Sequence, residues 1–356
     1  MKFIALLPLL SYSFTATYPS FRIPAYLNAL PKVFIDGEAG TTGLQVRERL
    51  SKRDDLEVIS PPPDLRKDPV TRKKYLNDAD AAILCLPDSA SIEAAEWLKG
   101  ELGCEGGGGE GSCTMTTDGG KRWCRHILST AISRILAHIS AHTHSHTNDT
   151  FIHSLADNDS TVLIDASTAF RTNPSWTYGF PELSPQQRIE VQSSKRISNP
   201  GCYPTGFISL VRPLVEAGII EIGTGLTVNA ISGYSGGGKQ LMSLYETDES
   251  CEPWGSYGFD LNHKHLPEMA LYSGLSKKPI FQPAVGNFPQ GMVVSVPLHY
   301  DMLKGNTGKE CWNALKVYYA ESKMISVQEM NGKGEAGLFT QVEEWVVRSA
   351  CTYPRN

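Results

Sequence analysis

The stretch KVFIDGEAGTTGLQVRERL, residues 32–50, decides the fold. It begins as a short apolar run that ends at Gly37, which is typical of a buried strand. A segment with apolar residues among charges follows and predicts a helix. Glycines between a strand and a helix permit a tight turn and the close approach of a phosphate, and the helix N-terminus favours an anion. The stretch therefore predicts a dinucleotide-binding loop.

The pattern continues outward from this loop. Strands are predicted at 56–60, 80–87 and 161–167, and helices at 70–79 and 88–98. Alternating strands and helices are typical of an α/β fold with a doubly wound parallel sheet. We therefore predict this architecture for the first half of the chain.

Composition shifts divide the chain. Residues 32–199 form the predicted dinucleotide-binding domain, and residues 99–160 interrupt it with a low-complexity glycine run and a histidine-rich end. Residues 200–330 form a second domain, and residues 331–356 are a tail without a strong period. Residues 1–31 resemble a leader, either cleaved or assigned from a wrong start. The histidines and cysteines of the interruption match no zinc spacing, so no metal is expected.

Composition and charge exclude several classes of protein. The chain has 356 residues, 41% of them hydrophobic and 20% charged, which indicates a globular protein. Its net charge of −5 argues against a nucleic-acid partner, and the absence of a long apolar run argues against a membrane span. Eight scattered cysteines favour a reducing compartment, so we expect a cytoplasmic protein. An organelle is the alternative if residues 1–31 are a transit peptide.

The end of the second strand indicates which dinucleotide binds. An NAD site usually has an acidic residue there, whereas this strand ends at Ser60 and is followed by Arg66 and Lys67. A hydroxyl and two cations suit a 2′-phosphate, so we predict NADP; the alternative is that both cations are solvated loop charges. The residues expected to hold the cofactor are Gly37, Ala39, Gly40, Thr41, Thr42, Gly43, Ser60, Arg66 and Lys67.

The segment SNPGCYPTG, residues 198–206, contains a candidate nucleophile. Cys202 follows a Pro-Gly turn and precedes an amphipathic helix. A helix N-terminus lowers the pKa of a thiol, and the thiolate is the reactive form. The alternative is a structural cysteine. His263 and His265 lie in NHKHLPEM near a predicted helix start, where a histidine is able to take the thiol proton, unless the pair is a solvated loop.

Two further features suit an anionic substrate. The segment GYSGGGK, residues 233–239, combines successive backbone N–H groups with Lys239. Arg171 in ASTAFRT is a candidate clamp for a carboxylate or phosphate, although an isolated arginine is usually a surface charge.

These motifs together resemble a known family. KVFIDGEAGTTGLQVRERL, ILCLPD, IDASTAFRT, YGFPEL, SNPGCYPTG, ISGYSGGGK and HKHLPE occur in the order found in the shorter form of N-acetyl-γ-glutamyl-phosphate reductase. The chain is more distantly similar to other semialdehyde dehydrogenases. The resemblance covers residues 32–98 and 161 to about 300. It implies a dinucleotide-binding domain followed by an α+β catalytic and dimerisation domain, in a homo-oligomer that is a dimer or tetramer.

The resemblance also implies a reaction in arginine biosynthesis. NADPH would reduce N-acetyl-glutamyl 5-phosphate to N-acetyl-glutamate 5-semialdehyde through a thioester on Cys202. The acid/base histidine falls in the H-x-H pair, with His265 as first choice and His263 as second. The residues implied to contact the small-molecule substrate are Arg171, Asn199, Ser235 and Lys239.

Two departures from the family pattern leave alternatives open. The interruption at 99–160 is foreign to it, and residues 331–356 lack the family's closing helix. An inactive or impaired relative is therefore one alternative. A reductase of another acyl phosphate, such as aspartyl phosphate, is the other, because one methylene changes binding by only about 1–3 kcal/mol.

Overall fold

A computed structural model describes residues 30–98, 160–247, 251–329 and 347–349. The account below concerns the unit that begins at residue 31. The predicted leader, nearly all of the interruption and most of the tail lie outside the described residues.

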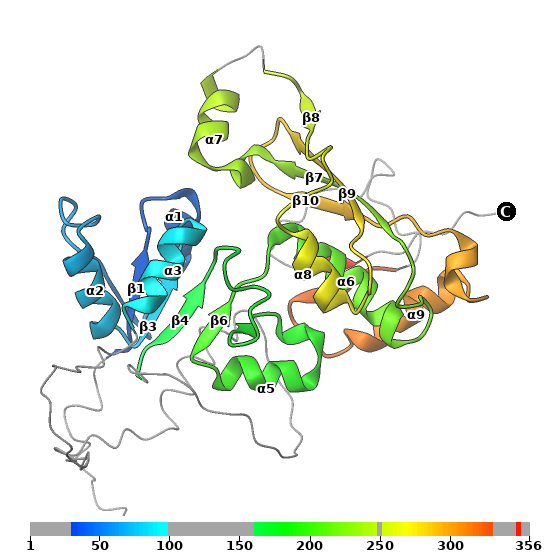
Figure 1. Ribbon diagram of the computed structural model, residues 1–356, viewed down its shortest axis with the longest axis horizontal. Coiled ribbons are helices and arrows are strands. Elements are labelled where there is room, and N and C mark those ends of the chain that lie inside the picture. Colours follow the sequence, from blue (N-terminus) through cyan, green and yellow to red (C-terminus); the bar gives the residue numbers. More distant parts are fainter. Residues whose placement is uncertain (1–29, 99–159, 248–250, 330–346, 350–356) are drawn as a thin grey trace, which may run out of the picture. The chain divides into compact units, whose positions relative to one another are not determined.

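The first half of the unit forms a parallel sheet of six strands in the order β2-β1-β3-β4-β6-β5 (Figure 1). Every neighbouring pair is parallel. The strands are β1 (Lys32–Asp36), β2 (Glu57–Ile59), β3 (Ala81–Leu84), β4 (Val162–Asp165), β5 (Thr177–Tyr178) and β6 (Arg196–Ser198). The prediction of an α/β fold with a parallel sheet is confirmed. β3 and β4 pair directly, although the interruption separates them in sequence.

Helices cover both faces of this sheet. They are α1 (Thr41–Leu50), α2 (Pro69–Asp78), α3 (Asp88–Glu96) and α5 (Pro185–Ser193). Successive side chains of β1 point to opposite faces, so Val33 and Phe34 belong to two different apolar clusters. The Val33 cluster includes α1 and α5 residues, and the Phe34 cluster includes α2 and α3 residues. The sheet is therefore doubly wound, as predicted.

The second half is built on a mixed sheet in the order β10-β7-β9-β8. β7 and β9 are parallel, and the two outer pairings are antiparallel. The strands are β7 (Thr227–Gly233), β8 (Trp254–Ser256), β9 (Ile280–Gly286) and β10 (Met292–Ser295). The helices are α6 (Cys202–Glu216), α7 (Gly238–Thr247), α8 (Leu266–Ser273) and α9 (Gly308–Tyr318), with short 3-10 turns η2 (Pro181–Leu183), η3 (Tyr234–Gly237) and η4 (Tyr300–Leu303).

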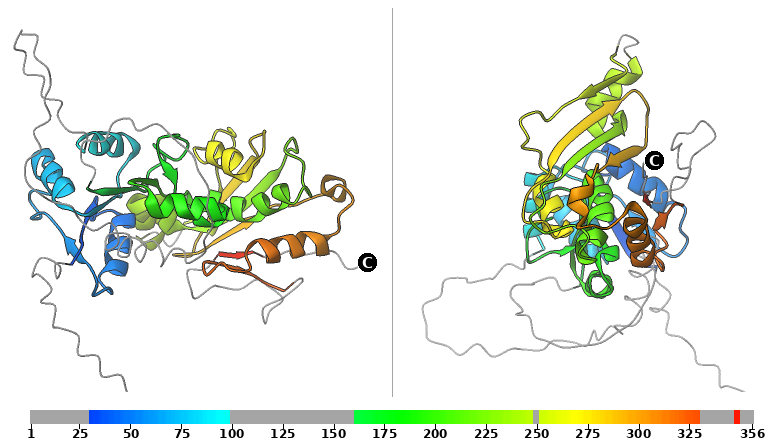
Figure 2. Two further views of the ribbon diagram at one scale, coloured as in Figure 1. Left: turned by 90° about the horizontal axis from the view of Figure 1, so that it is seen from below. Right: turned by 90° about the vertical axis from the view of Figure 1, so that its right-hand side faces the viewer.

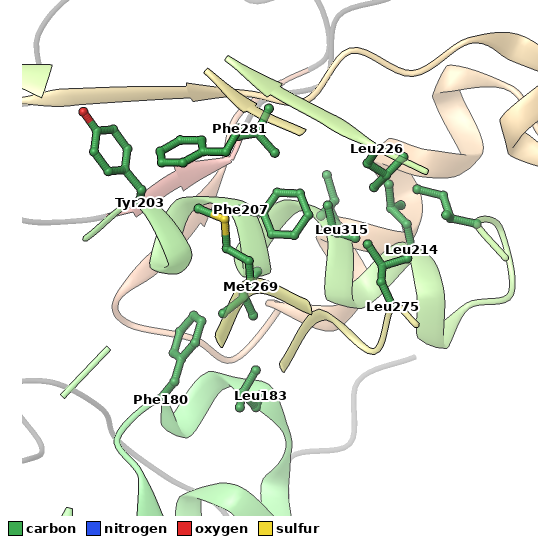
Figure 3. Packing of buried hydrophobic residues seen from close by; sticks show 14 of the residues in the cluster. Phe180, Leu183, Tyr203, Phe207, Leu214, Leu226, Met269, Leu275, Phe281 and Leu315 are labelled. Carbon is green, nitrogen blue, oxygen red and sulfur yellow. The ribbon is translucent and has the colours of Figure 1, made fainter. Parts of the chain in front are cut away.

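The helices α6 and α8 lie side by side and share a core with one face of the second sheet (Figure 1). Figure 3 shows Phe207 of α6, Met269 of α8 and Phe281 of β9 gathered in this core. All three side chains are almost completely buried. Burial of such a side chain contributes about 1.5–3 kcal/mol. The core therefore fixes α6 and α8, the two helices whose first turns carry the motif residues.

A small parallel pair, β11 (Ile325–Val327) with β12 (Val347–Ser349), ends the described chain. It is visible in orange-red and red in the left panel of Figure 2. The sequence shows no strong period in the tail, where β12 lies. A three-residue strand is too short for its periodicity to stand out in the sequence.

Candidate active site

The glycine loop has the geometry that the sequence predicts. Gly37 ends β1 with a φ of +84°, and a Cβ added there would lie 2.4 Å from the carbonyl oxygen of Cys85. A Cβ on Gly43 would lie 2.3 Å from the carbonyl oxygen of Gly37. Gly40 is the N-cap of α1, and none of the described side chains caps this helix end. The loop therefore presents the backbone N–H groups of a helix N-terminus, as a phosphate requires.

A buried carboxylate lies beside this loop. The Glu38 side chain is 6% exposed, and its Oε1 lies 2.8 Å from Arg66 Nη2. Its Oε2 accepts hydrogen bonds from the Ser60 hydroxyl, at 2.7 Å, and from Arg47. Arg47 also donates to Ser60 Oγ, at 2.6 Å. Two of the predicted cofactor residues, Ser60 and Arg66, thus come together around an anion.

Cys202 is the first residue of α6, and Gly201 is its N-cap. Sequence analysis placed the cysteine at a helix N-terminus, and the structure does the same. Its side chain is exposed, whereas the adjacent Gly201 and Tyr203 are buried. The Tyr203 hydroxyl donates to Ser232 Oγ at 2.9 Å, which ties the start of α6 to the end of β7. An accessible thiol therefore stands on a rigid support.

The electrostatic setting of Cys202 differs from the expectation. Burial of the surroundings raises the pKa of its thiol, and this effect outweighs the others. The backbone N–H groups of Tyr203 and Cys202 and the charge of Arg171 lower the pKa, while the charge of Glu268 raises it. The predicted lowering by the helix terminus is present, but the expectation of a net lowering is wrong, because desolvation disfavours the charged thiolate more strongly.

Both histidines of the H-x-H pair lie next to the residues that flank Cys202. Their ring centroids are 4.7 Å apart, and they lie 6.5 Å (His263) and 6.0 Å (His265) from the Tyr203 ring. A Cβ on Gly201 would be 3.0 Å from His265 Cδ2. The structure thus places the two histidines that sequence analysis selected against the residues on either side of Cys202.

The two imidazoles have different environments. His265 is 6% exposed, and burial, then the charge of Arg171, lowers its pKa to about 2. Burial also lowers the pKa of His263, with a further contribution from Lys264 and an opposing one from Asp260. The His265 backbone N–H donates to His263 Nδ1 at 3.2 Å. In its neutral form His263 therefore carries its proton on Nε2.

Arg171 differs from the expected substrate clamp. It is 7% exposed, and each of its nitrogens donates to a protein acceptor. Nε donates to the Asn199 carbonyl at 2.9 Å, Nη1 to Glu268 Oε1 at 2.8 Å, and Nη2 to the Ala166 carbonyl at 3.1 Å. These bonds make Arg171 a structural tie between loops.

The other predicted substrate residues lie in separate elements. Asn199 is exposed in the turn before Cys202. Ser235 lies in η3, and Lys239 is exposed in the first turn of α7. Ser232, the residue directly before the 233–239 segment, contacts the start of α6. Substrate contact by Asn199, Ser235 and Lys239 therefore stays a prediction.

Comparisons with known proteins show the family of the chain. N-acetyl-γ-glutamyl-phosphate reductase from Rhizobium etli is 40% identical over 302 residues, covering 83% of this chain and 79% of the relative. N-acetyl-γ-glutamyl-phosphate reductase 2 from Nostoc sp. is 39% identical over 305 residues, covering 83% and 77%. The chain belongs to the N-acetyl-γ-glutamyl-phosphate reductase family. Residues 202–348 also match the family model described as semialdehyde dehydrogenase, dimerisation domain.

Solved structures support the fold of this family. The crystal structure of aspartate semialdehyde dehydrogenase II from Vibrio cholerae has a TM-score of 0.53 at 12% identity and covers 91% of this chain and 88% of its own. A probable aspartate-semialdehyde dehydrogenase from Pseudomonas aeruginosa has a TM-score of 0.50 at 11% identity, covering 90% and 87%.

Sequence analysis missed three residues of the candidate site. Glu268 accepts a hydrogen bond from Arg171, and Glu38 and Arg47 complete the cluster at Ser60. Glu268 had a usable signal, because it follows His265 by three residues and so lies on the same side of a helix. Glu38 had none, because an acidic residue in a glycine loop is equally compatible with an exposed position.

The described part of the chain contains no group of three or more histidine, cysteine, aspartate or glutamate side chains placed to hold a metal ion. None of its helices has the length and apolar character that crossing a bilayer requires. The histidine-rich end of the interruption lies outside the described residues.

Proposed function

We propose that this protein reduces N-acetyl-glutamyl 5-phosphate to N-acetyl-glutamate 5-semialdehyde with NADPH, a step of arginine biosynthesis. The observation that carries the proposal is the exposed Cys202 at the N-terminus of α6, whose neighbour Tyr203 contacts both rings of the H-x-H pair. The names of the relatives support the choice of substrate. A thiol in this position is suited to attack an acyl phosphate.

The proposed reaction proceeds through Cys202. Its thiol, which is accessible to solvent, loses a proton to water, and the thiolate attacks the acyl carbon. The carbon–oxygen bond to phosphate breaks, phosphate leaves, and a thioester remains on the sulfur. NADPH, when bound, supplies the hydride that brings the thioester carbon to the aldehyde level. The carbon–sulfur bond then breaks, which releases the semialdehyde and restores the thiolate.

Sequence analysis named His265 as the first choice for the acid/base histidine. His263 is the better candidate for the histidine that assists the reaction. A pKa lowered to about 2 keeps His265 neutral, so it is a poor proton carrier near neutral pH. His263 is less buried, and its Nε2–H is a donor because Nδ1 already accepts a hydrogen bond. We propose that this N–H stabilises the acyl oxygen as it becomes negative, which replaces the expected role of taking the thiol proton.

The residues near the glycine loop fit NADP. Arg47, Arg66 and Ser60 converge on the carboxylate of Glu38, so their position already suits an anion such as a 2′-phosphate. The N-terminus of α1 suits the pyrophosphate. The proposed cofactor set therefore gains Arg47 and keeps Gly37, Ala39, Gly40, Thr41, Thr42, Gly43, Ser60, Arg66 and Lys67.

We also propose a homo-oligomer. One face of the second sheet packs on α6, and the opposite face carries exposed residues such as Ile280 on β9 and Val293 on β10. The family model described as a dimerisation domain covers this sheet. An apolar, exposed sheet face is suited to pairing with a second copy. A cytoplasmic location is proposed from the biosynthetic reaction, with an organelle as the alternative if residues 1–31 direct import.

The test is phosphate-dependent reduction of NADP with N-acetyl-glutamate 5-semialdehyde, compared with aspartate semialdehyde at the same concentration. We expect turnover with the first substrate, and loss of turnover in Cys202→Ala. Cys311→Ala serves as the control for loss of a thiol. Wild-type turnover in Cys202→Ala would refute the thioester route. A preference for aspartate semialdehyde would refute the substrate assignment, and a folded wild-type protein without turnover would indicate an impaired relative.

A further inference from the structure

Glu268 joins three parts of the chain that are far apart in sequence. It lies in the first turn of α8 and is 1% exposed. Its Oε1 accepts from Arg171 Nη1 at 2.8 Å. Its Oε2 accepts from the Tyr178 hydroxyl at 2.9 Å and from the Gly201 backbone N–H at 3.1 Å. The carboxylate thus bonds directly to the residue that precedes the proposed nucleophile.

Arg171 holds the same turn from the other side. Its Nε donates to the carbonyl oxygen of Asn199, two residues before Gly201. The turn before Cys202 is therefore attached to one ion pair at two points, a carbonyl and an N–H group. A buried ion pair is weak evidence for stability, since desolvation offsets much of its attraction. Its arrangement around the turn indicates a positional role instead.

Close packing at Gly201 restricts movement between the turn before Cys202 and the Arg171–Glu268 ion pair. A Cβ at this position would lie 2.7 Å from both Arg171 Nη1 and Glu268 Oε1. The same Cβ would lie 3.0 Å from the ring of His265, which precedes Glu268 by three residues. The ion pair and the histidine therefore contact the backbone of the turn itself. A movement of α8 would displace Glu268 and His265 together.

We propose that Glu268 is a positioning residue, which fixes the turn carrying Cys202 against α8 and, with Arg171, sets the charge that the thiol experiences. The proposal rests on the proposed thioester function. It assigns Glu268 no contact with substrate. The negative charge of Glu268 is needed because Arg171, a buried cation beside the thiol, would be unstable without a counter-charge.

The proposal makes a directional prediction about the thiol. Arg171 lowers the pKa of Cys202 and Glu268 raises it, while the nearby Tyr257 hydroxyl stays protonated because burial raises its pKa. The groups facing Glu268 itself are Arg171, Tyr178 and Tyr272. Replacing the carboxylate by an amide leaves the positive charge of Arg171 uncompensated. The thiolate should then form at lower pH.

The experiment measures alkylation of Cys202 by iodoacetamide as a function of pH, on the full chain, with the modified peptide quantified by mass spectrometry. Glu268→Gln is expected to shift the profile to lower pH. Tyr178→Phe removes one hydrogen bond to the same carboxylate without changing a charge, and its profile should match the wild type. Superimposable profiles for Glu268→Gln and wild type, or a shift to higher pH, would overturn the proposal.

A second variant separates position from charge. Glu268→Asp keeps the charge and withdraws the carboxylate by one methylene, so the alkylation profile should stay in place while kcat falls roughly tenfold or more. Wild-type kcat in this variant would overturn the positioning role, and it decides the question if Glu268→Gln fails to fold. Alkylation needs no substrate, so the alkylation test for Glu268 does not depend on turnover. A wild-type protein without turnover would count against the proposed function only, and the alkylation profiles would still decide the role of Glu268.

Discussion

At the scale of single residues, desolvation determines the direction of the pKa shifts of Cys202 and His265, the two groups that sequence analysis ranked first. Desolvation disfavours a charge of either sign, so it raises the pKa of Cys202 and lowers that of His265. Sequence patterns identified both side chains, because a turn before a helix and an H-x-H pair are visible in the chain. They did not reveal how strongly the surrounding protein desolvates each group, because those surroundings come from segments distant in sequence.

Neutral burial of His265 predicts a pH-dependent stability. Its pKa is about 2 in the folded protein against 6.5 ordinarily, so the unfolded state binds the proton more readily. The contribution is present above pH 6.5 and decreases as the pH falls below that value. The loss of unfolding free energy amounts to about 2 kcal/mol at about pH 5. Urea unfolding at about pH 7.5 and about pH 5 should show a smaller pH dependence in His265→Gln than in the wild type.

The exposed His299 is the control for this prediction. His299→Gln makes the same substitution at an exposed position and so controls for the substitution itself. Equal pH dependence in His265→Gln and the wild type would contradict the neutral burial of His265.

The arginines at Glu38 predict a selective effect on cofactor binding. In the proposed cofactor site, Arg66→Ala would remove one charge-assisted bond to a 2′-phosphate, worth about 1.5–3 kcal/mol. The dissociation constant for NADPH, measured by titration of its fluorescence, should rise at least about tenfold, with that for NADH nearly unchanged. Lys74→Ala, which removes an exposed cation from α2, is the matched control. An equal effect of Arg66→Ala on both dinucleotides would contradict the assignment.

At the scale of elements, most of the first half was predictable from sequence. Strands β1, β3 and β4 are continuous apolar runs, and such runs are typical of a parallel sheet buried on both faces. Strands β5 and β12 were not predicted, because two or three residues are too few to show a period. The Arg171–Glu268 tie was also beyond sequence reasoning, since it joins segments 97 residues apart.

The contact between β1 and α1 predicts that Gly43 tolerates no side chain. Gly43→Ala would place a methyl group 2.3 Å from the Gly37 carbonyl oxygen, so the helix must move away from the loop. The expected cost is about 1–3 kcal/mol of unfolding free energy, with weaker NADPH binding. Gly225→Ala is the control, because no heavy atom lies within 4 Å of its Cβ position. Equal urea midpoints for the two variants would show that the loop adapts without cost.

At the scale of the whole molecule, the exposed face of the second sheet is open to a direct test. Val293 on β10 is 53% exposed and Ile280 on β9 is 49% exposed. Val293→Asp would place a charge in the proposed interface, which is costly when buried without a partner. Sedimentation should show a smaller assembly for this variant than for the wild type. The control is Val317→Asp on α9, which is 78% exposed and lies outside that sheet. An unchanged assembly in Val293→Asp would place the interface elsewhere.

The pairing of β12 with β11 has a practical consequence for anyone who shortens or extends this chain. β12 also contacts α6, the helix that starts at Cys202. A truncation upstream of residue 347 would strip an edge from β11 and uncover part of that helix. Recombinant design should therefore treat the last strand as part of the catalytic half and attach any fusion partner beyond it.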